Sequence, residues 1–526
     1  MRHSILAVFI VSVTACGVFG DTAGDDETPS GGSPAGPGTP APPLEGTPSE
    51  DQITEKYGVF VALGAAADAD GTRAKPFGTI AAGIERAVAE SKRVYVCAGT
   101  FKESIKVANG IPMVGGFDCS RPTWPASGER TRVESPTSPA IVANDISAPT
   151  RIEGFDIFAP DGSDTAPSSI GLHAKSSPAL TFARSKITAG KGRDGAPGTD
   201  GVQLSLGANA AGGGSDSEWQ GADTSTLVGG TLKWRPGAAG GIGACVGKAG
   251  FSPSDGGAGG KGGTHDTETK TPNGGLTGSY WRAYCGGTAI VMGQPVCVTK
   301  WNATAGTVLA PQPGTAGTDG TSASQAGTIN GEGYTPRDGT TGTDGSVGSG
   351  GSGGAGGELV GYVGAPGTTR YGYGATGPGG GAGGCPGLAG TAGKGGGASI
   401  GALLVSSKGL TFDGAEVLAS PGGAGGKGSF GSNPTNGGAA GAVLGTAVAA
   451  QPGGAGGRAG ISGSGAGGPS YGIAQTLGDA VFVNGASAKS AAGGAAVAEE
   501  TKNDAPAGAR KLPASTAGDS KDQYNF

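Results

Sequence analysis

Residues 71–101 read GTRAKPFGTIAAGIERAVAESKRVYVCAGTF, and this stretch determines the fold expected for the chain. Apolar residues recur at helical spacing from Ile80 to Val88, so a short amphipathic helix is expected over 80–89, with Thr79 as its N-cap. Runs of β-branched and aromatic residues on either side predict short strands. These runs are 57–61, 94–101, 105–107 and 111–119.

The order of these elements resembles the opening of right-handed parallel β-helix domains of the pectin-lyase-like type, as found in bacterial surface proteins. The matching residues are Gly71-Thr72, Pro76-Phe77, Thr79-Ile80, Gly99-Thr100-Phe101 and Gly115-Gly116-Phe117. The resemblance covers about 70 residues and implies an all-β fold, a right-handed parallel β-helix with a short N-terminal capping helix. Such a helix would cover the open edge and apolar end of the first coil, where an uncovered edge strand invites aggregation.

A weak internal repeat recurs much further along the chain. Segments 152–159, 182–189 and 412–419 align with one another, 483–488 is a fainter fourth copy, and upstream flanks 169–172, 399–402 and 470–473 agree as well. Three copies run directly into glycine, so the glycine-rich tracts are expected to be long insertions that leave the same corner of successive coils. The organisation predicted from this pattern is β-helix coils at 53–189, a glycine-rich insertion with small ordered islands at 190–397, further coils at 398–495 and a disordered polar tail at 496–526.

Glycine accounts for 114 of the 526 residues, about three times its usual ~7% share. A triplet period holds from Gly192 to Gly201 but then breaks, so a collagen triple helix is not expected. Several Asp-Gly pairs suggest calcium-binding turns, but they lack the nonapeptide register of calcium β-rolls, so turn chemistry is the preferred interpretation. These pairs start at Asp194, Asp200, Asp319, Asp338 and Asp344.

Two interpretations of the glycine stay open. One is extended, glycine-lined strands packed side by side, which the absence of a Cβ permits; the other is disorder. The texture also resembles the Gly/Ala-rich surface repeats of mycobacteria (PE-PGRS-like), although this similarity is one of low complexity and implies no mechanism.

The N-terminus predicts export. A cationic start and an apolar run from Ile5 to Val13 are typical of a signal peptide, assigned to residues 1–15, and the run is too short to span a membrane. Val13-Thr14-Ala15-Cys16 resembles the bacterial lipobox, which implies a lipid on Cys16 and stable anchoring by several acyl chains. Gly17 favours the outer membrane. Residues 16–52 are acidic and rich in Pro, Gly and Ser, so a disordered tether is expected.

Six cysteines remain after Cys16, and an even number in an exported chain suggests disulfides. Cys97 and Cys119 are separated by about one coil, so they are expected on neighbouring rungs ~4.8 Å apart, within disulfide reach; the alternative is two free buried thiols. Leu227–Trp234 is one candidate ordered island. Residues 280–301 form another, a hairpin that a Cys285–Cys297 bond would hold together, which leaves Cys245 for Cys385.

No catalytic residue, metal site or cofactor is predicted. The cysteines lack metal-ligand spacing, and the net charge of −6 disfavours nucleic acid as a partner. His173 is interpreted as a packed or surface residue, and Asp156 and Glu416, at one repeat position, as ordinary solvated charges.

The expected function is that of a cell-surface lipoprotein with a non-catalytic structural, adhesive or glycan-interaction role. Its expected partners are the membrane, through Cys16, and extracellular polysaccharide or other surface components. Trp281 and Trp301 are candidates for stacking on sugar rings, or else belong to the small core of the insertion. The alternative function is a polysaccharide lyase or hydrolase that acts on acidic glycans along the β-helix groove.

Overall fold

The chain divides into two units, Met1–Pro42 and Pro43–Phe526. The structure is a computed structural model, and all the residues that it describes belong to the second unit. It describes 47–526 except for 216–218, 222–226, 229–230, 233–236, 259–280, 292–293, 304–309, 357–370, 374, 446, 477 and 505–507. Side chains throughout 216–236, 259–309 and 357–374 lie outside the described set.

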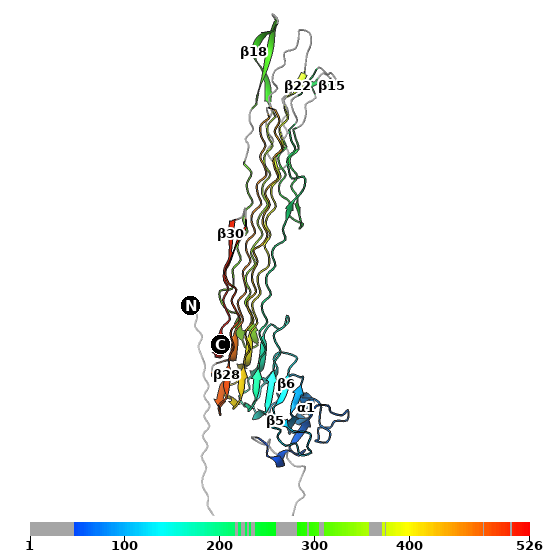
Figure 1. The fold of residues 1–526 in the computed structure, drawn as a ribbon, viewed down its shortest axis with the longest axis vertical. Coiled ribbons are helices and arrows are strands. Elements are labelled where there is room, and N and C mark those ends of the chain that lie inside the picture. Colours follow the sequence, from blue (N-terminus) through cyan, green and yellow to red (C-terminus); the bar gives the residue numbers. More distant parts are fainter. Residues whose placement is uncertain are drawn as a thin grey trace, which may run out of the picture. The chain divides into compact units, whose positions relative to one another are not determined.

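Three sheets of parallel strands form the part of the fold that we call the strand stack (Figure 1). Sheet A has the order β1 (Gly58–Val61), β2 (Arg93–Cys97), β5 (Met113–Phe117), β8 (Thr150–Glu153), β11 (Leu180–Ala183), β24 (Leu410–Asp413) and β27 (Ala480–Val483). Sheet B has the order β3 (Gly99–Phe101), β6 (Thr131–Glu134), β9 (Phe155–Phe158), β12 (Lys186–Thr188), β25 (Glu416–Leu418) and β28 (Ser487–Lys489). Sheet C has the order β4 (Ile105–Lys106), β7 (Ile141–Asn144), β10 (Ser169–Lys175), β23 (Ser399–Val405), β26 (Ser470–Gln475) and β31 (Ser520–Asn525).

From β2 onward the chain visits sheets A, B and C in that order and then begins again. The glycine-rich segments follow β12, β25 and β28, and each one ends at a strand of sheet C. All three therefore leave from the junction between sheets B and C, as the repeat pattern predicted.

The predicted repeats are neighbours in the sheets. Phe182 pairs with both Ile152 and Phe412, and the Phe182 and Phe412 rings stack with centroids 5.9 Å apart inside the stack. The fourth copy aligns as predicted at β28, but at β27 the alignment is wrong by one residue, because Asp413 pairs with Val483 rather than with Asn484. The turn between β27 and β28 has one residue more than the turn between β24 and β25.

The predicted helix is α1 (Ile80–Glu90), which follows the short 3-10 helix η1 (Glu50–Gln52) and β1 in the chain. The Thr79 side chain accepts a hydrogen bond from Ala82 N, so it is the N-cap. Ile80, Ile84 and Ala87 are buried in the core that fills the stack. Val88, expected on the same apolar face, is 54% exposed.

The remaining strands pair antiparallel, outside the strand stack. They are β13 (Ser205–Leu206) with β17 (Cys245–Val246), β14 (Trp219–Gly221) with β22 (Tyr371–Tyr373), β15 (Leu227–Val228) with β16 (Thr231–Leu232), β18 (Trp281–Val291) with β19 (Gln294–Ala303), β20 (Thr328–Asn330) with β21 (Gly333–Thr335), and β29 (Glu500–Asp504) with β30 (Gly508–Leu512).

The described glycine-rich residues of 190–215, 237–258, 310–356, 375–397 and 420–469 form side-by-side extended chains, which we call the glycine bundle (Figure 1). Its hydrogen bonds between chains repeat every three residues. Gly192, Gly195 and Gly198 donate their amides to the carbonyl oxygens of Pro421, Ala424 and Lys427. Three residues per turn is the period of a polyproline II helix, whereas a β-strand has a period of two.

Glycine is required because the chains touch through their backbones. A Cβ added to Gly192, Gly195, Gly198 or Gly201 would overlap a carbonyl oxygen of the neighbouring segment 388–397. The triplet period seen in the sequence is therefore a contact pattern between segments of one chain. Of the two interpretations left open, the described residues follow the extended chains and not disorder.

The Asp-Gly pairs are not turns, so the turn interpretation is wrong. Their carboxylates accept backbone amides of neighbouring chains, and each pair lies in extended backbone. The acceptors are Asp194 for Ala424 N, Asp200 for Phe430 N, Asp319 for Ile461 N, Asp338 for Gly395 N and Asp344 for Ala389 N, at 2.7–3.2 Å.

The expectation of a disordered tail at 496–526 is also wrong. Strand β31 pairs with β26, and the Tyr524 ring stacks on Tyr471 with centroids 4.5 Å apart. Strands β29 and β30 form a hairpin, in which Arg510 is 2% exposed and donates to Phe430 O of the glycine bundle. The polar residues of this tail are ordered by contacts with β26 and with Phe430, which are distant in the sequence, so no local sequence pattern predicts them.

Candidate functional site

Three segments whose side chains lie outside the described residues, 216–236, 259–309 and 357–374, have flanking residues that meet at one end of the glycine bundle. Backbone hydrogen bonds join Ser215 N to Ala442 O, Ala238 N to Gly377 O, Gly257 N to Gly351 O, Gly354 N to Pro378 O and Val448 N to Ala355 O, at 2.8–3.1 Å. The residues that lead into and out of these segments are thus neighbours. We call this group of residues the loop end; Figure 1 shows β15, β18 and β22 beyond it.

The hairpin of β18 and β19 carries both tryptophans predicted as candidates. Trp281 lies opposite Ala303, and Trp301 lies opposite Ala283. The two tryptophan positions are therefore two residues apart in the register of the hairpin. Their side chains, and with them the predicted Cys285–Cys297 disulfide, fall outside the described residues. The same is true of Cys16 and of most of the expected tether.

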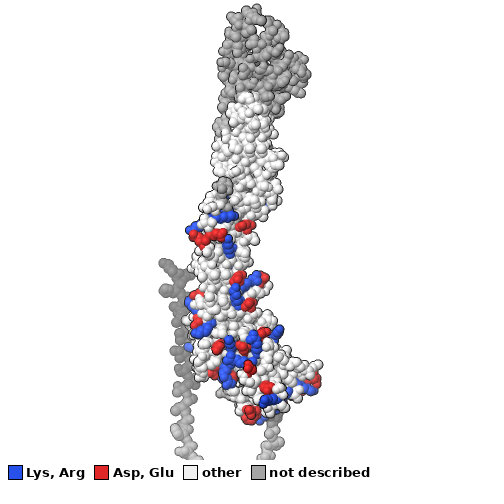
Figure 2. Space-filling model, in the orientation of Figure 1, with Lys and Arg blue, Asp and Glu red and all other residues white. Residues whose placement is uncertain are grey.

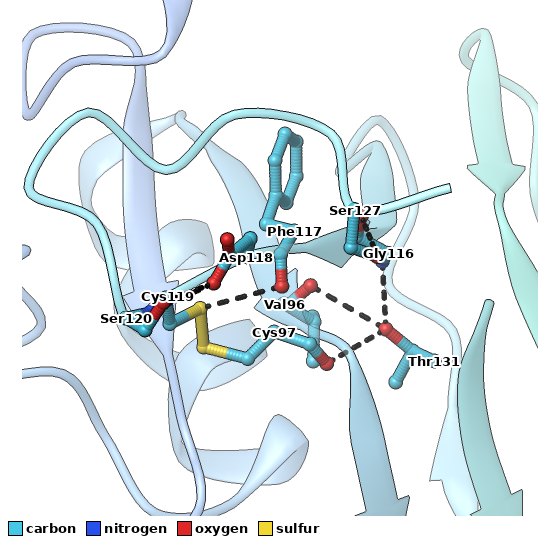
Figure 3. The surroundings of a disulfide bond; sticks show 9 residues. All are labelled: Val96, Cys97, Gly116, Phe117, Asp118, Cys119, Ser120, Ser127 and Thr131. Atoms are coloured by element: carbon cyan, nitrogen blue, oxygen red, sulfur yellow. Dashed lines mark hydrogen bonds between the residues drawn. A yellow bond between two sulfur atoms is a disulfide. The ribbon is translucent and has the colours of Figure 1, made fainter. Parts of the chain in front are cut away.

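A disulfide joins Cys97 to Cys119, as the coil spacing predicted (Figure 3). It begins a loop, 118–130, that folds over the outer face of sheet A. Trp124 of this loop is 3% exposed and packs edge-on against Phe60, with ring centroids 4.9 Å apart. At the end of the loop Thr131 Oγ1 donates to Cys97 O at 2.8 Å and accepts from Gly116 N, so both ends of the loop are fixed to the stack.

The second disulfide joins Cys245 to Cys385, the pair predicted by elimination. It connects two segments of the glycine bundle that are 140 residues apart in sequence. Leu204 and Leu388 are buried around it, and together they form a small apolar cluster within the bundle. The bond therefore holds two neighbouring extended chains in one register.

A polar cleft of about 800 Å³ lies beside the 118–130 loop. Its floor comes from β3, β6 and β9, and its wall from the end of the loop. The lining residues are Ala98, Gly99, Thr100, Gly128, Glu129, Arg130, Arg132 and Asp156. Two guanidinium groups and two carboxyl groups, the exposed one of Glu129 and the half-buried one of Asp156, thus line a single opening.

Both arginines are held in place by their neighbours. Arg132 donates to Glu134 at 2.8 Å and lies 3.8 Å from the centre of the Phe158 ring. Arg130 Nε donates to Arg184 O at 2.9 Å. These contacts hold the two guanidinium groups through Nε and Cζ and leave their other N–H groups for a ligand, which lowers the entropy lost when a ligand binds.

Asp156 is the carboxyl on the floor. Burial raises its pKa above the ordinary value, although Lys186, Arg132 and Arg130 act in the opposite direction. One of its oxygens is buried and has no hydrogen-bond partner among the described residues. The interpretation of Asp156 as an ordinary solvated charge is therefore wrong; Glu416, at the same repeat position, is exposed as expected.

Charges alternate across the outer face of sheet B. Arg132, Asp156, Lys186 and Glu416 occupy one register row, with N–O distances of 3.8 Å for Arg132–Asp156 and 3.9 Å for Lys186–Glu416. Figure 2 shows charged side chains gathered over the strand stack, whereas the face of the glycine bundle beyond it is white over much of its length. On this face, charged side chains are thus more frequent on the stack than on the glycine bundle.

Glu153 is the most buried acid among the described residues, at 1% exposure. It accepts hydrogen bonds from Arg151, Arg184 and Thr47, and Arg151 also reaches Asp413 at 3.2 Å. This network is not predicted from the sequence, because its members are far apart in the chain. Through it, Thr47, the first described residue, lies against sheet A of the strand stack.

His173 is half-buried, with Nε2 2.9 Å from Gly331 O in the turn of the β20–β21 hairpin, in keeping with a packed residue. Among the described residues, no group of three His, Cys, Asp or Glu side chains has the geometry of a metal site. No helix in the described part of the chain is long and apolar enough to cross a membrane.

No known protein family, no curated protein and no solved structure matches this chain.

Proposed function

We propose that this protein is an exported, lipid-anchored display protein with a non-catalytic binding role at the surface of a bacterium. In this proposal the strand stack is a right-handed parallel β-helix, the glycine bundle is a rigid support, and the segments at the loop end bind an extracellular glycan or another surface component. The observation that carries the proposal is that three segments of the 190–397 insertion leave and re-enter the glycine bundle at the same end. Binding residues are commonly found on loops that a rigid scaffold positions.

The β-helix assignment is supported by strand order and chemistry. The chain passes through sheets A, B and C in the same order in each repeat, and connections between parallel strands are right-handed in nearly all proteins. Ladders of like residues, such as the stacked Phe182, Phe412 and Phe482 rings, are the expected interior of such a coil.

The length of the bundle supports display. Residues 190–215 run from the strand stack to the loop end, and at ~3.1 Å per residue they span roughly 80 Å. The chain from Cys16 reaches the described part at Thr47, which contacts Glu153 and Arg184 of the strand stack. A lipid on Cys16 would therefore attach the protein through its strand stack, with the loop end at the other end of the bundle.

Mass spectrometry of the purified mature protein tests the anchor. The proposal expects an N-terminal Cys16 that carries a diacylglyceryl group and an amide-linked acyl chain, and Cys16→Ser is expected to abolish acylation and release the protein from membranes. A mature chain that begins elsewhere, or that has an unmodified Cys16, would contradict the anchoring.

Binding of the full chain to a panel of bacterial surface and extracellular polysaccharides tests the display role. The double variant Trp281→Ala and Trp301→Ala is expected to lose at least tenfold in affinity for the bound glycan, since stacking contributes about 1 kcal/mol or more for each aromatic ring. Lys408→Ala, an exposed change in the turn before β24, is the control and should bind normally. Unchanged binding by a folded double variant would show that the β18–β19 hairpin is not the glycan-binding site. Release of depolymerised glycan would instead favour the alternative function, a polysaccharide lyase or hydrolase.

A further inference from the structure

The cleft beside the 118–130 loop is separate from the loop end, and the proposed function does not use it. The geometry points to a binding site here for a small oxyanion that also carries hydroxyl groups, such as a sugar acid or a polyol phosphate. In this site Arg130 and Arg132 hold the oxyanion, and Asp156 Oδ2, the carboxylate oxygen that is not closed off from solvent, accepts a hydrogen bond from a ligand hydroxyl.

Separate elements of the fold bring charged side chains to one cleft. Arg130 comes from the loop, Arg132 from β6 and Asp156 from β9, yet all three line one cleft of about 800 Å³. A cleft of this volume falls within the range of small-molecule sites. Guanidinium groups bind carboxylate and phosphate oxygens through paired, charge-assisted hydrogen bonds.

The placement of Asp156 in this cleft lowers the stability of the fold. Asp156 keeps one buried oxygen without a hydrogen-bond partner among the described residues, and its carboxyl sits in surroundings that disfavour its charge. A buried unsatisfied polar atom costs about 1–3 kcal/mol. Its counterpart in the next coil, Lys186, and the one after that, Glu416, carry no such unpartnered oxygen or nitrogen in the described structure. The unusual carboxyl occurs only where the register row enters the cleft.

The walls of the cleft are held in place before a ligand arrives. The Cys97–Cys119 bond and Thr131 fix the two ends of the loop, and Arg130 and Arg132 have their own partners in Arg184 and Glu134. Open space remains beside Gly128, where an added Cβ would meet no atom within 4 Å. A preorganised opening of this kind binds with a smaller entropic cost.

Calorimetric titration of the full chain in detergent tests the proposal with four probes. Gluconate and glycerol 2-phosphate carry both an oxyanion and hydroxyls, inorganic phosphate has no carbon-bound hydroxyl, and glucose has no charge. At least one of the first two is expected to bind at least tenfold more tightly than glucose, and which of them binds better identifies the source as a carboxylate or a phosphate. Equal binding of glucose, or no binding of either anion at about 20 mM, would overturn the proposal.

Substitutions locate the site. Arg130→Gln and Arg132→Gln are each expected to weaken binding of the better anion at least tenfold, since a hydrogen bond to a charged group contributes about 1.5–3 kcal/mol. Arg121→Gln, on the same loop but outside the cleft lining, is the matched control and should bind normally. Thr100→Trp, which fills the opening without removing a charge, should also abolish binding.

Asp156→Ala tests the contact with the ligand hydroxyl separately from the contacts with the oxyanion. It is expected to lower affinity for glycerol 2-phosphate at least fivefold while leaving inorganic phosphate within about twofold. Each variant is checked for an unchanged thermal transition, so that loss of binding is not loss of fold. If folded Arg130→Gln and Thr100→Trp variants bind as well as the wild type, the cleft is not the site.

Discussion

Within the glycine bundle, Asp194 and Gly195 both form hydrogen bonds with one residue, Ala424, of a neighbouring extended segment. The carboxylate of Asp194 accepts the amide of Ala424 at 2.8 Å, while the amide of Gly195 donates to the carbonyl of the same Ala424, also at 2.8 Å. Asp319 and Gly320 treat Ile461 in the same way. In these two Asp-Gly pairs, glycine allows the close approach, and aspartate satisfies an amide that would otherwise lack a partner.

This contact predicts which glycines tolerate substitution. A Cβ on Gly195 would overlap the carbonyl oxygen of Lys394, and the backbone there is held on both sides. Gly195→Ala is therefore expected to destabilise the bundle by at least about 1–3 kcal/mol, the usual cost of overpacking. Ala196→Ser, at the adjacent exposed position, should change the free energy of unfolding by less than about 0.5 kcal/mol. Chemical denaturation of both variants measures the difference, and equal stabilities would contradict the packing.

The contact between Asp194 and Ala424 also predicts a dependence on pH. The hydrogen bond from Ala424 N, assisted by Lys191, lowers the pKa of Asp194 below its ordinary value of 3.8. A carboxylate with a depressed pKa stabilises the folded state above its unfolded pKa, and this stabilisation is lost as pH falls through the folded pKa.

The stability difference between the wild type and Asp194→Asn should therefore shrink as pH falls from about 5 to about 2. Because Asp194 is exposed, the difference is expected to stay below about 1 kcal/mol. Denaturation of both proteins across this pH range measures it, and a difference independent of pH would show that the Asp194 charge makes no contribution.

At the scale of elements, the 118–130 loop depends on its disulfide. Cys97 and Cys119 close a loop of 22 residues, and a bond across a loop of this length stabilises a fold by about 2–4 kcal/mol. Cys97→Ala with Cys119→Ala is expected to lower the free energy of unfolding by this amount and to make the chain near Trp124 accessible to protease. The double variant Cys245→Ala and Cys385→Ala, which removes the other disulfide, is the comparison and should leave Trp124 protected.

The elements that the sequence predicted are those with a local signal. Helix α1, the strands on either side of it and the Cys97–Cys119 pairing follow from periodicity and spacing within about 60 residues. The repeats after β12 were also found, because apolar and small residues recur at matching positions in each coil. Strand β31 was missed, since its polar residues show no alternation and become a strand only by pairing with β26.

The candidate sites, like the elements, include some that have a local sequence signal and some that do not. Cysteine spacing and tryptophans can be read from a sequence, but the cleft cannot, because Arg130 and Asp156 meet only through the stacking of β6 on β9 and the closure of a loop. The burial of Asp156 is likewise a property of the folded loop. The network around Glu153 joins Thr47 to Asp413 across more than 360 residues of sequence, which no local pattern reports.

At the scale of the whole molecule, the proposed display role depends on the structure of the glycine-rich insertions. The strand stack supplies one corner from which they leave, and the glycine bundle brings the flanks of 216–236, 259–309 and 357–374 together at the loop end, whereas the insertion after β28 turns back earlier, at β29 and β30. A disordered insertion of the same composition would leave the flanks of these three segments unrelated in space, and the proposed display role would then lose its basis.

Residue-resolved hydrogen exchange of the full chain tests most directly whether the glycine-rich insertions form the ordered glycine bundle. Gly314, Gly317 and Gly320 donate their amides to Ala455, Arg458 and Ile461, whereas Ala316 and Asp319 have no amide partner among the described residues. The bundle therefore predicts slow exchange at these glycines, by about a hundredfold or more, and fast exchange at Ala316 and Asp319, repeating every three residues. Exchange of all five amides at the rate of an unstructured peptide, or protection that alternates every two residues, would contradict the bundle.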